Sequence, residues 1–168
     1  MQRRRLLLVA TTSALAVGLG LASRGRSAAD SPVAAFAVSH SDEEWRRLLT
    51  PAQHAVLREH GTERPYSSPL DAEERVGTYH CAGCAQPLFA STAKFHSGTG
   101  WPSFTAPIEG AVGTTDDWGF FMHRTEVHCS RCGGHLGHVF EDGPPPTGLR
   151  YCMNGVAMTF TPADGSQS

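Results

Sequence analysis

Two short segments, Cys81-Ala82-Gly83-Cys84 and Cys129-Ser130-Arg131-Cys132, decide how this chain is expected to fold. Each segment is a C-x-x-C pair, and a glycine lies within the first pair and directly after the second. Glycine lets the backbone turn so that its N–H groups face the two sulfurs. Two such turns bring four thiolates into a tetrahedral array, which is the preferred environment of structural Zn²⁺. We therefore expect one structural Zn²⁺ per chain, held by Cys81, Cys84, Cys129 and Cys132.

Two other uses of the same four cysteines stay open. Iron in a rubredoxin-like arrangement takes the same ligands. Two disulfides are the main rival to a metal in a protein that leaves the cytoplasm. However, a C-x-x-C pair oxidised within itself closes a very small loop, which usually serves redox chemistry and not the stapling of a fold. A metal with four sulfur ligands keeps no open position, so we do not expect it to be the catalyst.

The composition indicates one globular domain. Of the 168 residues, 40% are hydrophobic and 18% are charged, which is enough for a single domain with its own core. The net charge of −2 argues against a protein that binds nucleic acid through its phosphates. The 18 glycines and 11 prolines, with frequent turn signals after residue 61, favour β structure with many loops over a helix bundle.

The N-terminal residues have the pattern of an export signal. Arg3-Arg4-Arg5 precedes an uncharged stretch over 6–21, which is too short and too glycine-broken for a membrane span. The start resembles a twin-arginine signal, and an ordinary secretory signal or an uncleaved anchor is the alternative. We expect residues 1–37 to be the signal and a short linker, and residues 38–168 to be the domain, with its core over 41–161. The expected location is the bacterial periplasm or cell envelope.

Two short helices are predicted to open the domain. Ser41-Asp42-Glu43-Glu44 has the spacing of a capping box, and Thr50-Pro51 places a cap and an N-terminal proline before a second helix that ends by Gly61. The inward faces are predicted to be Trp45, Leu48 and Leu49 in the first helix, and Ala52, Ala55, Val56 and Leu57 in the second.

Strands are predicted for most of the remaining chain. The segments are Thr78–Cys81, Pro87–Phe89, Trp118–Val127, His135–Phe140 and Leu149–Phe160. The last segment does not alternate fully, which predicts a bulge near Asn154-Gly155. The glycine-rich Ser97–Ser103 is predicted to be a shaped loop.

The fifth cysteine, in Gly148-Leu149-Arg150-Tyr151-Cys152-Met153-Asn154, has no partner. On a strand, Arg150 and Cys152 project from the same face, so a positive charge is expected beside the sulfur and a lowered thiol pKa with it. His135 and His138 lie three residues apart upstream, and Asp142 follows. Any one of these is most simply structural, but together with a lone cysteine they form a plausible acid–base set.

Several segments taken together resemble the B-type methionine sulfoxide reductases. They are Ser97-Gly98-Thr99-Gly100-Trp101-Pro102-Ser103-Phe104, His135-Leu136-Gly137-His138-Val139-Phe140, Asp142-Gly143-Pro144 and Gly148–Asn154. Val56-Leu57-Arg58 and Gly61-Thr62-Glu63-Arg64-Pro65 resemble the start of that domain, and the two C-x-x-C pairs match its zinc-bearing form. The segments agree in order and spacing over residues 41–161, so the resemblance is more specific than any single motif.

The resemblance implies a mainly β fold of two antiparallel sheets in a small barrel-like (Mss4-like) arrangement, preceded by short helices. It also implies reduction of the R epimer of methionine sulfoxide in proteins or peptides. Separately, we expect a monomer that binds no nucleic acid. Carried over by position, Cys152 would be the nucleophile, and Trp101 would form the apolar wall for the substrate's S-methyl group. The polar side of the site would be lined by His135, His138 and Asn154, with His138 the leading proton donor. Arg150 and Asp142 would pair nearby.

One departure from the family concerns the recovery of the enzyme. Many members carry a second redox cysteine, either where this chain has Thr99 or in the region of Ser67 and Ser68. With four cysteines on a metal, no such cysteine remains. We therefore expect direct reduction of an oxidised Cys152 by a thioredoxin-like domain or a small thiol. His96 also replaces the acidic residue that usually precedes Ser-Gly.

Two competing hypotheses use the same residues. Zinc-stapled sheets of this shape also serve as binding modules, in proteins resembling a guanine-nucleotide-release factor or the ligand-binding domain of cereblon; Trp101 would then be a cage wall and Cys152 a core residue. A binding module does not need Arg150, Cys152, His138 and Asp142 at once, which favours the enzyme. A thiol–disulfide carrier that uses the C-x-x-C pairs is the third hypothesis.

Overall fold

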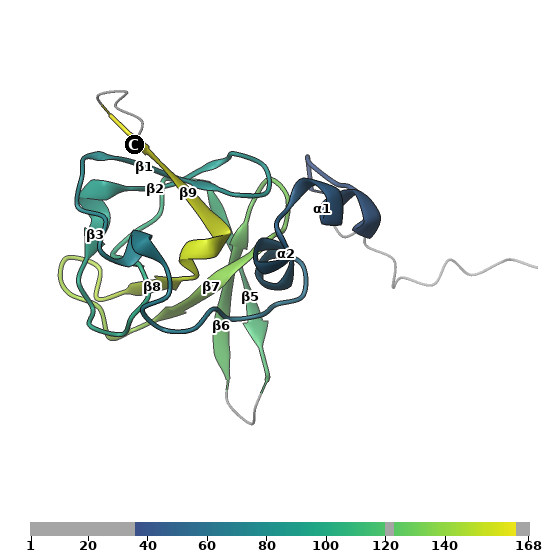
Figure 1. Ribbon diagram of the computed structural model, residues 1–168. Helices are drawn as coiled ribbons and strands as arrows, with labels where there is room; N and C mark the ends of the chain where they lie inside the picture. Colours follow the sequence, from purple (N-terminus) through teal and green to yellow (C-terminus); the bar gives the residue numbers. More distant parts are fainter. Residues whose placement is uncertain (1–35, 120–122, 164–168) are drawn as a thin grey trace, which may run out of the picture. The chain divides into compact units, whose positions relative to one another are not determined.

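The computed structural model describes residues 36–119 and 123–163. Two short helices, α1 (Asp42–Leu48) and α2 (Pro51–Leu57), precede the strands, and Figure 1 shows them together at one side of the sheets. The strands form two antiparallel sheets. The predicted fold class, mainly β with two antiparallel sheets and short N-terminal helices, is therefore confirmed.

The smaller sheet has the order β2-β1-β9, and the larger one the order β3-β4-β8-β7-β6-β5. The bounds are β1 (Gly77–Cys81), β2 (Pro87–Ala90), β3 (Lys94–Phe95), β4 (Ser103–Phe104), β5 (Val112–Asp117), β6 (Arg124–Cys129), β7 (His135–Phe140), β8 (Arg150–Met153) and β9 (Met158–Pro162). Three 3-10 helices lie between them: η1 (Pro69–Asp71), η2 (Ser91–Ala93) and η3 (Gly155–Ala157). The order places β7 and β8 side by side in the middle of the larger sheet.

Both helices begin with capping boxes, of which the sequence predicted the one in α1 and only the Thr50 cap in α2. The Glu44 N–H donates to Ser41 Oγ at 3.3 Å while the Ser41 N–H donates to Glu44 Oε2 at 2.8 Å, and Thr50 and Gln53 repeat the pattern in α2. These reciprocal bonds satisfy N–H groups that a helix start leaves unpaired. The boxes fix where each seven-residue helix starts.

The predicted inward faces are wrong at two positions. Leu48 is 60% exposed, because the buried stripe of this short helix continues from Trp45 to Leu49 and Leu48 lies beside it. Ala52 is exposed as well, since α2 buries His54, Val56 and Leu57 instead. An apolar residue at i+3 is not enough to define the face of a helix of two turns.

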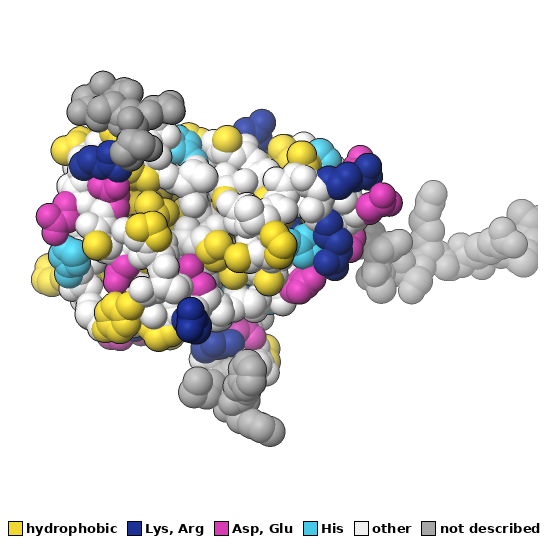
Figure 2. Space-filling model, viewed as in Figure 1, with side chains coloured by type: hydrophobic (Ala, Val, Ile, Leu, Met, Phe, Trp, Pro, Cys, Tyr) yellow, Lys and Arg dark blue, Asp and Glu magenta, His cyan; other side chains and the backbone are white. Residues whose placement is uncertain are grey.

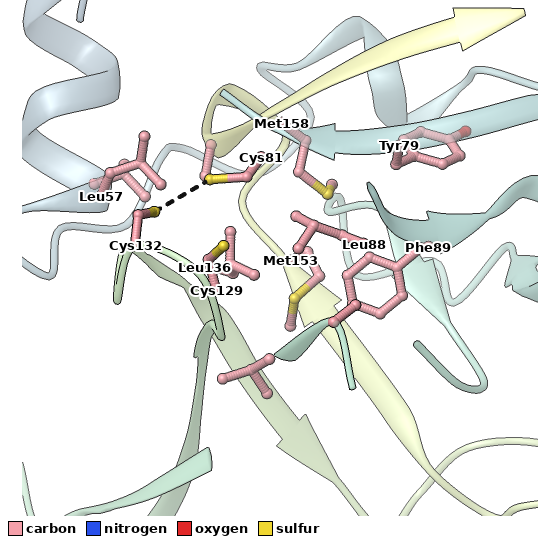
Figure 3. Packing of buried hydrophobic residues seen from close by; sticks show 14 of the residues in the cluster. Leu57, Tyr79, Cys81, Leu88, Phe89, Cys129, Cys132, Leu136, Met153 and Met158 are labelled. Atoms are coloured by element: carbon pink, nitrogen blue, oxygen red, sulfur yellow. Dashed lines mark hydrogen bonds between the residues drawn. The ribbon is translucent and has the colours of Figure 1, made fainter. Parts of the chain in front are cut away.

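The core lies between the two sheets. Phe89 stacks on Phe104 with ring centroids 4.3 Å apart, and Tyr79 meets Phe104 edge to face at 4.9 Å. Such pairs contribute about 0.5–1.5 kcal/mol each beyond the burial of their area. Figure 3 shows the core cluster with Tyr79 and Phe89 at one end and the sulfurs of Cys81 and Cys132 at the other. The cysteine cluster therefore continues the hydrophobic core.

The predicted strand over Trp118–Val127 is confirmed only from Arg124 onward, where it coincides with β6, and Trp118 and Gly119 are not in a strand. The structure has a hairpin there, in which β5 ends at Asp117 and β6 begins at Arg124. β5 itself was not predicted, because its last four residues are Thr or Asp and it lacks a clear apolar alternation. Phe120 and Phe121, placed by the prediction in mid-strand, lie outside the described residues.

The predicted strand over Leu149–Phe160 is divided. β8 belongs to the larger sheet and β9 to the smaller one, and η3 joins them. The predicted bulge near Asn154-Gly155 is thus the point where the chain crosses from one sheet to the other. Its anchor is the side chain of Asn154, which donates to the Leu136 carbonyl at 3.0 Å and accepts from the Glu63 N–H at 2.9 Å.

The surface carries charges of both signs. In α1, Arg46 pairs with Asp42 at 2.8 Å and with Glu59 at 3.2 Å. Figure 2 shows basic and acidic side chains close together on this face, with hydrophobic atoms between them. Within residues 36–119 and 123–163, no helix is both long and apolar enough to cross a membrane. The predicted export signal at 1–37 lies outside the described residues except for Phe36 and Ala37.

Candidate active site

The four paired cysteines come together as a single cluster. Their sulfurs lie within 4.8 Å of one another, with Cys81 Sγ 3.7 Å from Cys132 Sγ and Cys84 Sγ 3.5 Å from Cys129 Sγ. A disulfide would bring two sulfurs to about 2.05 Å. Four sulfurs at about 2.3 Å from a zinc ion would lie about 3.8 Å apart in a tetrahedron. The spacing therefore fits a tetrahedral metal site, and it does not fit two disulfides.

Both turns of the cluster are closed by the backbone. The Ala85 N–H donates to the Cys81 carbonyl at 2.8 Å, and the Gly133 N–H donates to the Cys129 carbonyl at 2.9 Å. In the second turn the left-handed residue is glycine, with Gly133 at φ 67°, as the sequence led us to expect. In the first turn it is Ala85, at φ 58°, and Gly83 is not the left-handed residue.

Hydrogen bonds from Cys132 and Cys81 hold the pKa of the Cys129 thiol below its ordinary value.

Cys152 lies apart from this cluster, on β8. Its neighbours across the sheet are Ser103 on β4 and His138 on β7. Directly opposed residues in antiparallel strands present their side chains on the same face. A hollow of about 170 Å³ opens there, lined by Thr62, Trp101, Arg124, His138, Cys152 and Asn154, among others. The structure thus brings together four of the residues predicted from the sequence: Trp101, His138, Cys152 and Asn154.

The Cys152 thiol does not show the lowered pKa that its nearby arginine predicts. Burial raises the pKa of this thiol above its ordinary value, and a hydrogen bond with Thr99 and the charge of Arg150 only partly oppose the rise. Thr99 Oγ1 lies 3.9 Å from Cys152 Sγ. The desolvation of a half-buried sulfur outweighs the attraction of one cation.

The predicted pair of Arg150 and Asp142 is present. Arg150 donates through Nε and Nη2 to the two carboxylate oxygens, at 2.8 and 2.7 Å, and its guanidinium lies 4.5 Å from the centroid of Phe140. The guanidinium holds the pKa of the Asp142 carboxyl below its ordinary value. Because the carboxylate neutralises much of its charge, Arg150 acts on the thiol weakly.

One segment before the sheets holds two sides of the hollow together. The Trp101 indole N–H donates to the Glu63 carbonyl at 3.2 Å, and the Glu63 N–H donates to Asn154 Oδ1 at 2.9 Å. The Glu63 carboxylate accepts from the N–H groups of Gly155 and Val156, and burial raises its pKa. Glu63 was not among the predicted site residues, although the Gly61–Pro65 segment was noted in the sequence.

His138 has a partner that the sequence did not indicate. Its Nε2 lies 2.8 Å from Asp117 Oδ2, and Arg124 Nη2 donates to the same oxygen at 2.7 Å. The Gly119 N–H donates to the other oxygen at 2.9 Å. The hydrogen bond with His138 and the charge of Arg124 lower the pKa of the Asp117 carboxyl to about 2. Asp117 is the last residue of β5 and Arg124 the first of β6, and the two are paired in the register. The sequence analysis missed this contact because it did not predict β5.

His135 is not part of the hollow around Cys152. It is 2% exposed, and its Nδ1 lies 2.7 Å from Glu126 Oε1, which also lies 3.1 Å from His60 Nδ1. Burial lowers the pKa of His135 below its ordinary value, against the effect of Glu126. Its Nε2 is buried without a hydrogen-bond partner among the described residues. This trio of residues has ligand atoms close enough for a metal ion, but Glu126 already bonds both imidazoles.

Comparison with known proteins identifies the family. The model of the SelR domain matches residues 49–162. A peptide methionine sulfoxide reductase MsrB of Agrobacterium fabrum is 56% identical over 126 residues, which are 74% of this chain and 93% of the relative. The MsrB of Pseudomonas putida is 58% identical over 125 residues (74% and 94%), and that of Methanosarcina barkeri 56% identical over 133 (78% and 94%). This chain belongs to the SelR domain family.

Membership of the SelR family confirms the resemblance to B-type methionine sulfoxide reductases that the motifs indicated. The matched residues contain the whole cysteine cluster and the whole hollow around Cys152. The family therefore accounts for both sites with one domain.

Proposed function

We propose that this protein reduces methionine (R)-sulfoxide in proteins or peptides to methionine, and so repairs oxidative damage. The proposal is carried by one observation: Cys152 and His138 are directly opposed on β8 and β7 and line the same hollow, with Trp101 at its edge. In one small hollow, the thiol can attack the sulfur of a sulfoxide while the imidazole donates a proton to its oxygen. The relatives are named peptide methionine sulfoxide reductases, which supports the assignment.

The proposed reaction transfers one oxygen and two electrons. The Cys152 thiolate attacks the sulfoxide sulfur while the oxygen takes up two protons and leaves as water, so that an S–S bond forms and the S–O bond breaks. Water then attacks the cysteine sulfur, methionine departs with the electron pair of the S–S bond, and one proton is released. The sum is thiolate, sulfoxide and one proton giving sulfenic acid and methionine. A proton donor beside the thiol is therefore required.

Each predicted residue has a part in this proposal. Trp101 supplies the apolar wall for the S-methyl group, and Asn154 supplies a polar group on the opposite side. His138 donates the proton to the sulfoxide oxygen. Arg150, held by Asp142, favours the thiolate against the effect of burial. His135 does not line the hollow. It contributes through its contact with His138, where the ring centroids are 5.4 Å apart.

We further propose that the metal held by the four cysteines is zinc and that it is structural. Four sulfur ligands leave it no open position, and the cluster joins β1 to the β6–β7 turn at the end of the core. Iron would use the same ligands, so the metal content of the purified protein decides between them.

Recovery of Cys152 is proposed to need an external thiol. The chain has five cysteines, and the other four belong to the cluster. Two thiols, from a thioredoxin-like protein or a small molecule, would reduce the sulfenic acid to thiol, releasing water and a disulfide. Export to the periplasm or envelope stays a proposal based on residues 1–37; immunoblotting of cell fractions for the shortened chain tests it.

Two substrates test the assignment directly. Purified protein with dithiothreitol is given dabsyl-methionine (R)-sulfoxide and, separately, the S epimer, and the methionine product is separated by chromatography. We expect turnover of the R epimer alone. Turnover of the S epimer alone, or of neither, would refute the proposal, and binding without turnover would favour the alternative of a binding module.

A further inference from the structure

The β5–β6 hairpin supplies a carboxylate to each imidazole of the His135-x-x-His138 pair. Asp117, the last residue of β5, contacts His138, and Glu126 in β6 contacts His135. Only His138 lines the hollow that holds Cys152. The contact between Asp117 and His138 is therefore the one that bears on the reaction.

Asp117 is fixed at both of its oxygens. Oδ1 accepts from the Gly119 N–H at 2.9 Å, and Oδ2 receives His138 Nε2 at 2.8 Å and Arg124 Nη2 at 2.7 Å. Both side chains of the Asp117–Arg124 pair are about one-quarter exposed. A carboxylate held in this way has one orientation, and it can fix the orientation of the imidazole that it contacts.

The carboxylate also decides which nitrogen of His138 carries a permanent proton. An ionised carboxylate only accepts hydrogen bonds, and the low pKa of Asp117 keeps it ionised at neutral pH. His138 Nε2 must then be the donor, so Nδ1 is the nitrogen that can gain and lose a proton. In serine proteases a buried aspartate orients its histidine in the same manner.

We propose that Asp117 is a positioning residue, which holds His138 in the Nε2–H form and stabilises its doubly protonated state for proton donation to the sulfoxide oxygen. This inference rests on the proposed function. In the step itself, the proton on Nδ1 passes to the oxygen and leaves His138 neutral, still bonded to Asp117 through Nε2. Asp117 touches neither the substrate nor the thiol.

Several other charged groups surround His138. Arg124 on β6 opposes a positive imidazole, Glu126 lies opposite His138 in the β6–β7 register, and Arg150 and Cys152 lie on β8. Burial lowers the pKa of His135 on the same strand. Among these groups, Asp117 is the carboxylate that contacts the imidazole directly.

The test uses Asp117→Asn, with Asp116→Asn as the matched control. Asp116 is the neighbouring carboxylate, and it contacts the exposed His123 at 3.0 Å and not His138. We expect Asp117→Asn to lower kcat about 10- to 100-fold at pH 8, with KM changed less than about twofold. The alkaline limb of its kcat–pH profile should move to lower pH, because a negative charge that favours the protonated acid is lost. Asp116→Asn should match the wild type.

Two further measurements separate this idea from a structural role. In a His138→Gln background, Asp117→Asn should lower kcat less than about twofold, because an effect that Asp117 exerts through His138 is already lost when His138 is replaced. Nitrogen-15 NMR of the imidazoles, which needs no substrate, should show the Nε2–H form of His138 in the wild type and a smaller share of it in Asp117→Ala, which keeps no side-chain oxygen to accept from Nε2–H.

The outcomes distinguish the two proposals. An equal loss of activity in both backgrounds, an unshifted pH profile or an unchanged imidazole form would overturn the role of Asp117 and leave the reductase intact. A wild type that does not turn over the sulfoxide would refute the proposed function, and the NMR result would then still report on the contact.

Discussion

The cysteine cluster and the hollow around Cys152 differ in how they are built. The cluster uses two local C-x-x-C turns, all four residues supply the same atom, and its walls are the core itself. The hollow takes single residues from a loop, three strands and the segment before the sheets. The cluster is closed, whereas the hollow is open and holds a thiol whose pKa burial raises. This difference matches the two roles that we propose, a structural one for the cluster and a reactive one for the hollow.

A Cys→Ser substitution should remove activity at the hollow and stability at the cluster. The larger effect is expected at the hollow. Cys152→Ser should lower sulfoxide turnover by more than about a thousandfold, because a hydroxyl at neutral pH does not attack the sulfoxide sulfur as a thiolate does. The metal content and the thermal midpoint should stay close to the wild type. Turnover with dithiothreitol, metal analysis and calorimetry on one preparation check all three, and an active Cys152→Ser variant would remove the sulfur from the mechanism.

Cys132→Ser is the counterpart at the cluster. It should release the metal and destabilise the fold by about 3–5 kcal/mol or prevent folding altogether, because a structural zinc contributes directly to the free energy of folding. Chelation of the metal from the wild type should have the same effect on the thermal midpoint. A Cys132→Ser protein that keeps its metal and its midpoint would show that the cluster is not a structural site.

The contrast between the sites also explains what the sequence could reveal. The four-cysteine cluster follows from spacing alone, because both C-x-x-C turns are local and the second repeats the first. Cys152 was found as the cysteine without a partner, and Trp101 and Asn154 through the resemblance of distant segments to the family, and the fold brings all three together. His135 was grouped with His138 because they are three residues apart, yet on β7 they face different partners, Glu126 and Asp117.

Asp117 shows where sequence reasoning ends. It lies in a polar strand that has no apolar alternation, and the segment after it was predicted to be a strand and not a turn. Its contact with His138 depends on the register of β5, β6 and β7, which is set by long-range pairing. The role of Glu63 was missed for the same reason. Its backbone bonds Trp101, 38 residues away in the sequence, and Asn154, 91 residues away, and such long-range contacts leave no local pattern.

A second redox cysteine can be introduced at the hollow by substitution of Thr99. Thr99 Oγ1 lies 3.9 Å from Cys152 Sγ, so a cysteine at this position would lie near the sulfenic acid. Thr99→Cys should form a disulfide with Cys152 after one turnover without reductant, with a mass about 2 Da below the reduced form, whereas the wild type should gain about 16 Da. Thr105→Cys, on the strand end away from the hollow, is the control, and a disulfide in the wild type would contradict direct reduction by an external thiol.

The smallest expected effect concerns the charge beside the thiol. Burial raises the pKa of Cys152, and Arg150 opposes the rise, so Arg150→Met should raise this pKa further and leave less thiolate at pH 7–8. Because Asp142 neutralises much of the guanidinium charge, the shift should be small. Rates of alkylation by iodoacetamide from pH 6 to 11 measure it, with Arg47→Met in α1 as the control. An unchanged profile, or a shift toward lower pH, would show that Arg150 does not favour the thiolate and that its pair with Asp142 serves the fold instead.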